Sequence, residues 1–167
     1  MKSWTMRNQY RVSKYDPSLR DDDGAFRREE WTSRGDVGRV FNGVPLTDSA
    51  YRAVEAAYLF AVESLLCEAK VDTLYIHSLE NPAGHKLPSF IQTRAVLSVT
   101  QCVEFARMVL REMAWGKLVA PGRAYVHFGY DYYMYLGLPY QCRKAIAAVQ
   151  QRGLFVESCR SPYLRRR

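Results

Sequence analysis

The spacing of apolar residues along the chain predicts alternating strands and helices. The clearest helix begins at Thr47 or Asp48 and runs to about Lys70, because apolar side chains recur there every three or four residues. A second helix, capped by Ser98 or Thr100, is expected to end near Trp115-Gly116. A third carries Pro139 in its first turn and Gly153 at its end. Alternating or β-rich runs predict strands at 10–15, 73–79, 95–97, 117–120, 124–130, 132–136 and 154–156.

The order of these elements predicts an α+β fold. Hairpins alternate with crossovers, which favours a mixed, mostly antiparallel sheet packed by about three helices as one pair of layers. Residues 16–46 show no sustained period and are expected to form a long loop with one short helical turn near Asp36. We expect residues 1–167 to be a single domain, with 1–9 and 161–167 as mobile tails.

The candidate chemistry lies in residues 124–137, which hold five tyrosines, one histidine and one aspartate. Alternation predicts that Val126, Phe128 and Tyr130 face the core, with His127 on the opposite face and Asp131 at a bend. A carboxylate among phenols can anchor a basic group of a partner. The candidate binding residues are Trp31, Asp36, His127, Tyr130, Asp131, Tyr132, Tyr133 and Tyr135.

Plain structural roles also fit these residues. Asp131 can cap a turn while the tyrosines are half-buried sheet residues, because tyrosine suits sheets. Trp31 can be a plug that pins the long loop, or it can form a binding wall with Asp36. An alternative function is an enzyme or small-ligand domain, in which His127 and Asp131 line a pocket with Tyr75.

The distribution of charge and the spacing of the cysteines narrow the functional classes to which the chain can belong. The net charge is +7, but residues 138–167 hold seven Lys/Arg and one acid, including the terminal residues Arg165, Arg166 and Arg167. Nucleic acid is therefore not the expected partner, and binding through this tail is the weaker alternative. The four cysteines form no C-x-x-C pair, and no metal, cofactor or nucleophile motif is present. With no signal-peptide pattern or membrane-length apolar run, we expect a cytoplasmic protein.

Several strings suggest a relationship. YRVSKYDP from Tyr10, EWTS from Glu30, HFGYDYYMY from His127, GLFVES from Gly153 and SPY from Ser161 resemble a family of small uncharacterised bacterial proteins. The resemblance implies no activity. In general character the chain is also similar to immunity proteins that neutralise a toxin.

The sequence therefore favours a non-catalytic binding protein, possessing no cofactor, whose partner is another protein such as a toxin. Tyrosine and tryptophan often anchor interfaces because they bury large areas with little loss of side-chain freedom. On this hypothesis, Tyr132→Ala or Tyr133→Ala weakens partner binding and leaves the melting temperature near that of the wild type. The oligomeric state is left open.

Overall fold

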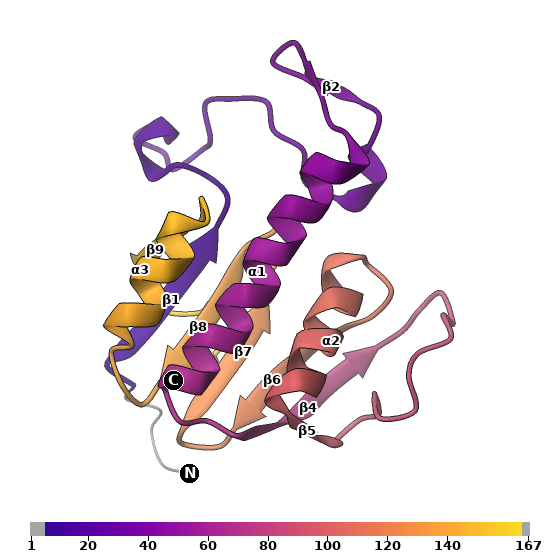
Figure 1. The fold of residues 1–167 in the computed structure, drawn as a ribbon, viewed down its shortest axis with the longest axis vertical. Helices are drawn as coiled ribbons and strands as arrows, with labels where there is room; N and C mark the ends of the chain where they lie inside the picture. The colour runs from indigo at the N-terminus through magenta and orange to yellow at the C-terminus, as the bar shows by residue number, and fades with distance from the viewer. Residues whose placement is uncertain (1–5, 165–167) are drawn as a thin grey trace.

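The computed structural model describes residues 6–164 as one sheet with helices on a single face (Figure 1). The sheet runs in the order β5-β4-β6-β7-β8-β1-β9, and each neighbouring pair is antiparallel. Its strands are β1 (Asn8–Ser13), β4 (Thr73–Glu80), β5 (Val96–Ser98), β6 (Trp115–Ala120), β7 (Ala124–Phe128), β8 (Met134–Leu138) and β9 (Phe155–Ser158). The helices are α1 (Asp48–Glu68), α2 (Val99–Leu110) and α3 (Arg143–Gln151).

The predicted α+β class is confirmed, and the sheet is antiparallel throughout. Helix α1 begins at an N-cap, where the Thr47 side chain accepts the Ala50 N–H at 3.1 Å. Its buried side chains, among them Tyr51, Tyr58 and Leu65, pack on the sheet between α2 and α3. No described helix is long and apolar enough to cross a membrane.

The helix-free face of the sheet is covered in part by the end of the described chain. Residues 159–164 follow β9, and the Ser161 hydroxyl lies 2.8 Å from His127 Nδ1. The Tyr163 ring packs edge-on against His127 and Tyr135, with centroids 6.2 and 6.1 Å apart. Residues 161–164 of the expected tail therefore contact the sheet.

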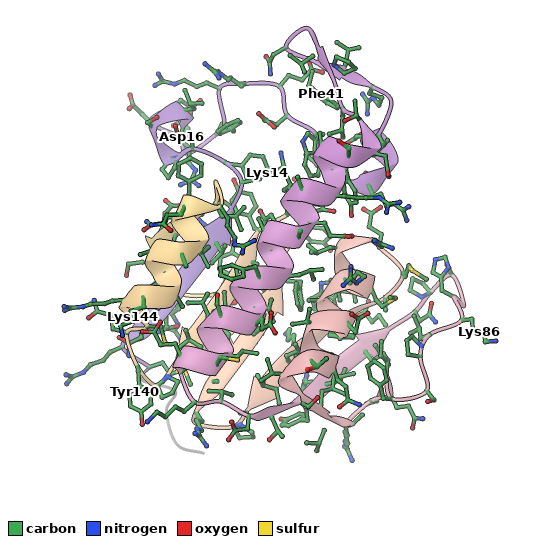
Figure 2. All side chains as sticks on the ribbon, in the orientation of Figure 1. Lys14, Asp16, Phe41, Lys86, Tyr140 and Lys144 are labelled. Atoms are coloured by element: carbon green, nitrogen blue, oxygen red, sulfur yellow. The ribbon has the colours of Figure 1, made fainter. Side chains whose placement is uncertain are left out.

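The long loop contains more structure than expected. A 3-10 turn at Pro17–Leu19 precedes the expected turn near Asp36, which spans Arg34–Asp36. A small hairpin of β2 (Val40–Phe41) and β3 (Val44–Pro45) follows. It protrudes at the end of the molecule where Figure 2 labels Phe41, far from Tyr140.

Two predicted helix boundaries are wrong. Helix α2 ends at Leu110 rather than near Trp115, because Glu112 adopts a left-handed φ of +59° and the Met113 N–H turns back to Met108 O at 2.9 Å. This arrangement closes helices but usually has glycine in the left-handed position. Trp115 instead opens β6.

The third helix begins at Arg143, so Pro139 precedes its first turn. Its cap comes from another helix, because the Glu68 carboxylate of α1 accepts the backbone N–H groups of Lys144 and Ala145. A cap supplied by a distant residue leaves no local signal in the sequence.

Candidate functional site

The β7–β8 connection is a tight turn with a tyrosine at a position that favours glycine. Phe128 ends β7, Met134 begins β8, and the Tyr133 N–H donates to Tyr130 O at 3.1 Å. The central residues Asp131 and Tyr132 have φ of +56° and +64°, as in a type I′ turn. That turn normally takes Asn-Gly or Asp-Gly, so Asp131 suits its position, whereas a left-handed backbone costs a residue such as Tyr132 about 1–3 kcal/mol.

Two buried phenols hold this backbone in place. The Tyr15 hydroxyl donates to Asp131 O, and the Tyr58 hydroxyl donates to Tyr132 O, both at 2.6 Å. Burial raises the pKa of both phenols, and the charge of Asp131 adds to the effect on Tyr15. Both phenols therefore remain donors at neutral pH, and the two carbonyls of the strained turn are satisfied from the body of the protein.

Tyr132 lies inside the protein. Only 6% of it is exposed, and its hydroxyl lies 2.8 Å from Leu110 O and 2.9 Å from the Tyr51 hydroxyl. Its ring contacts those of Trp31 and Tyr58, with centroids 5.1 and 5.4 Å away. Burial first, and then the hydrogen bond with Tyr51, raises the pKa of Tyr132. Tyr132 therefore anchors the turn instead of contacting a partner.

An ion pair continues this network into the helices. The Tyr51 hydroxyl donates to Glu55 Oε1 at 3.0 Å, and Arg111 binds both oxygens of Glu55 at 2.7 and 2.8 Å. Burial opposes ionisation of Glu55, but the hydrogen bonds and charge of Arg111 outweigh it and lower its pKa. This pair fastens the end of α2 to α1, and so fixes the segment that faces the turn.

A half-open cavity of about 280 Å³ lies beside the turn. The end of β4, the segment after α2 and the whole Gly129–Tyr133 turn contribute to its wall. Tyr130 stands at this cavity with 85% of its surface exposed, because β7 ends before it. The expectation that Tyr130 faces the core is wrong, whereas Val126 and Phe128 do face it.

Part of the backbone strain of the protein lies around the same cavity. Of the eight described non-glycine residues with positive φ, three line it: Glu112, Asp131 and Tyr132. Strained residues often cluster where a protein binds or acts, because a stable fold must hold them there against their preference. This coincidence makes the cavity the candidate site.

The two loop candidates, Trp31 and Asp36, are tied to the body of the protein. The Trp31 ring is buried against Tyr132 and has Lys14 Nζ 4.2 Å from its centroid. Figure 2 shows Lys14 between α1 and the loop near Asp16. Asp36 accepts the backbone N–H groups of Thr32 and Ser33 and pairs with Arg39 at 2.6 Å. Trp31 is the plug of the first interpretation, and the Asp36 carboxylate is occupied within its own loop.

His127 and Tyr135 lie on the helix-free face. His127 is 3% exposed, and burial, followed by the charges of Lys117 and His77, lowers its pKa to about 3. It is therefore neutral at physiological pH. The cavity beside the turn is lined by Asp131 but by neither His127 nor Tyr75, so it does not join the acid-base pair of the enzyme alternative.

The remaining candidate, Tyr133, is half-buried at the cavity wall. Its ring lies 5.1 Å from that of Tyr15, and the Arg11 guanidinium lies 5.3 Å from its centroid. Sequence reasoning missed Glu80, Glu112 and Trp115, which line the same cavity. No motif or spacing could have joined these residues, because they come from elements that only the folded sheet brings together.

A second cavity, of about 390 Å³, lies between α1 and α2. Most of its charged side chains are already paired, Arg111 with Glu55, Arg107 with Glu104, and Arg52 with Asp48, whereas Glu63 forms no ion pair with the described residues. Because these pairs satisfy one another, the second cavity offers less to a charged ligand than the first.

Over residues 6–164, no three His, Cys, Asp or Glu side chains come together in a group that could hold a metal ion. The basic residues Arg165 to Arg167 lie outside the described residues. No protein-family model, curated protein or solved structure matches the chain. The resemblance to small bacterial proteins therefore stays a prediction.

Proposed function

We propose that this chain is a non-catalytic binding protein that recognises another protein through the Tyr130–Asp131 turn and the cavity beside it. The observation that carries the proposal is the clamped turn, which holds an aromatic ring 85% exposed on a strained backbone. Because the backbone of the turn is already held in place, less conformational entropy is lost when Tyr130 binds, and exposed tyrosines often anchor interfaces.

The other exposed large apolar residues support this choice by their scatter. Val40 and Val44 lie on the protruding hairpin, Val96 lies on the edge strand β5, and Tyr140 lies near the start of α3 at the end opposite the hairpin (Figure 2). Single exposed apolar residues are normal on protein surfaces. Tyr130 differs from these residues because it adjoins a cavity with further aromatic side chains.

The proposal is tested by capturing the partner with wild-type chain from a lysate of the native host, purifying it and measuring its affinity. We expect Tyr130→Ser to weaken binding at least about tenfold, which corresponds to about 1.4 kcal/mol. Tyr140→Ser, a matched change at a residue 56% exposed, should leave the affinity within about twofold of wild type. Equal affinity for wild type and Tyr130→Ser would contradict the proposal.

A narrower proposal is that the partner is a toxin which the chain neutralises. The support is general character: a small protein with a preformed contact surface and no described metal cluster. Expression of the purified partner's gene in a heterologous host should then arrest growth, and co-expression of this chain should restore it. Co-expressed Tyr130→Ser should restore growth less well than Tyr140→Ser. A partner that leaves growth unchanged overturns the toxin proposal and leaves the binding proposal standing.

A further inference from the structure

The charged residues that line the cavity beside the turn are all acidic. Glu80 ends β4, Glu112 follows α2 and Asp131 lies in the turn, and no Lys or Arg contributes to this wall. None of the three carboxylates forms an ion pair with the described part of the chain. In a protein with a net charge of +7, this is a local reversal of sign.

Apart from Thr32 and Ser33, the rest of the wall is apolar or aromatic. Trp115, Tyr130 and Tyr133 supply rings, and the Trp115 indole N–H donates to Phe128 O at 2.9 Å, which fixes the orientation of that ring. The inner wall includes Val109, Leu110, Ala114 and Met134. Aromatic faces attract cations, and an apolar wall suits the aliphatic stem of a long side chain.

From these features we propose that the cavity binds an arginine side chain of the protein partner. The inference rests on the proposed function and names the chemistry that its surface recognises. A guanidinium group has five N–H donors in one plane, so it can pair with a carboxylate through its edge and stack on a ring through its face at the same time. A lysine ammonium group lacks the flat surface that stacking needs.

The size of the cavity agrees with a single side chain. At about 280 Å³ it lies just below the range of roughly 300–1,000 Å³ that small-molecule and cofactor sites occupy. Two of the wall's rings already have a basic group beside them, since the Arg11 guanidinium lies 5.3 Å from the Tyr133 centroid and Lys117 Nζ lies 5.8 Å from the Trp115 centroid. Arg11 pairs with Glu157 at 3.1 Å, Lys14 pairs with Glu30 at 2.9 Å, and Lys117 lies 5.5 Å from the Tyr163 ring centroid.

The test uses three acetylated, amidated tripeptides, Gly-Arg-Gly, Gly-Lys-Gly and Gly-citrulline-Gly, each titrated into the full ¹⁵N-labelled chain. We expect the arginine peptide to shift the Trp115 indole signal and the amides of residues 129–131. The lysine peptide should bind at least about threefold more weakly. The citrulline peptide, which has the same shape without the charge, should bind at least about tenfold more weakly. Equal binding of the arginine and citrulline peptides would overturn the inference.

Charge-neutralising variants locate the site. Asp131→Asn, Glu80→Gln and Glu112→Gln should each weaken arginine-peptide binding about threefold to tenfold, because each removes one charged acceptor. Asp22→Asn, the same charge change at an exposed loop residue, is the matched control and should bind as wild type. The three acids have no described ion pair to lose, so thermal unfolding should confirm that each variant folds. Equal weakening in Asp22→Asn would show a non-specific charge effect and overturn the inference.

The two proposals fail in distinguishable ways. If Tyr130→Ser weakens binding of the purified partner but the arginine peptide does not bind, the proposed function is supported and the arginine inference is overturned. If the arginine peptide binds at the cavity but the partner binds Tyr130→Ser as tightly as wild type, the arginine inference is supported and the proposed function is overturned.

Discussion

At the scale of single residues, the decisive feature is a tyrosine at a position that favours glycine. Tyr132 has φ of +64°, yet its side chain is among the most firmly held in the protein, through Tyr51, Leu110 and Trp31. Its buried contacts offset a backbone cost of about 1–3 kcal/mol. The strain is therefore maintained by packing, whereas Tyr130, two residues earlier and beyond the end of β7, is exposed.

Tyr132→Phe should lower the free energy of unfolding by about 1–3 kcal/mol, because it removes the hydroxyl beside the buried Leu110 carbonyl and leaves the Tyr51 hydroxyl with Glu55 alone. Urea unfolding measures this change. Tyr140→Phe removes a hydroxyl from an exposed ring and should alter the free energy by less than about 0.5 kcal/mol. An equally small effect of Tyr132→Phe would show that the hydroxyl does not stabilise the turn. The earlier expectation that Tyr132→Ala spares the melting temperature is replaced by a large loss.

At the scale of elements, the segment after β9, residues 159–164, helps to bury the helix-free face of the sheet. Ser161 and Tyr163 cover part of the helix-free face and bury His127 there. Because its pKa is lowered to about 3, His127 stays neutral in the folded protein, while in the unfolded chain it takes up a proton below about pH 6.5. The contribution of the neutral, buried His127 to the free energy of unfolding is therefore fully present above about pH 6.5 and is lost as the pH falls toward 3.

His127→Gln keeps a hydrogen-bonding side chain beside Ser161 but removes the titration. Between pH 6 and 4 the wild type should lose up to about 1.4 kcal/mol per pH unit more than this variant. The measurement is the free energy of urea unfolding at several pH values. His85→Gln, at an exposed loop histidine, should retain the wild-type slope. Parallel slopes for His127→Gln and wild type would mean that His127 is not buried neutral.

The same scale shows what the sequence could predict. The order along the chain of the seven sheet strands and three helices was predictable, because apolar residues recur every two positions in half-buried strands and about every 3.6 positions in packed helices. The β2–β3 hairpin was also open to prediction, since Asn42-Gly43 is the usual type I′ pair. The end of α2 was not, because Glu112 stands where glycine is the usual signal. Nor was the cap of α3, which comes from Glu68 of another helix.

For the candidate site, the sequence located the turn but not its surroundings. Asp131 falls at a bend as predicted, yet the alternation that placed Tyr130 inward stops where β7 ends. His127 shares the sequence segment with Asp131 but faces the side of the sheet that residues 159–164 cover. α1 and the long loop determine which tyrosines of the β7–β8 segment are buried. No local sequence pattern shows where these two elements pack.

At the scale of the whole molecule, one end of the sheet combines strain, exposed aromatic surface and negative charge. Tyr15 and Tyr58 clamp the turn from β1's loop and α1, while the Glu55–Arg111 pair fixes the end of α2 opposite it. The wall of the cavity is therefore held on both sides by buried contacts. Such preorganisation favours recognition with little rearrangement of the protein.

The most direct test of this account is amide hydrogen exchange of the full chain with and without its purified partner. The account predicts that the partner slows exchange at residues 129–133 and 112–115, which line the cavity, with little change at the β2–β3 hairpin and α3. Protection confined to the hairpin or to α3, with the turn exchanging as in the free protein, would contradict it.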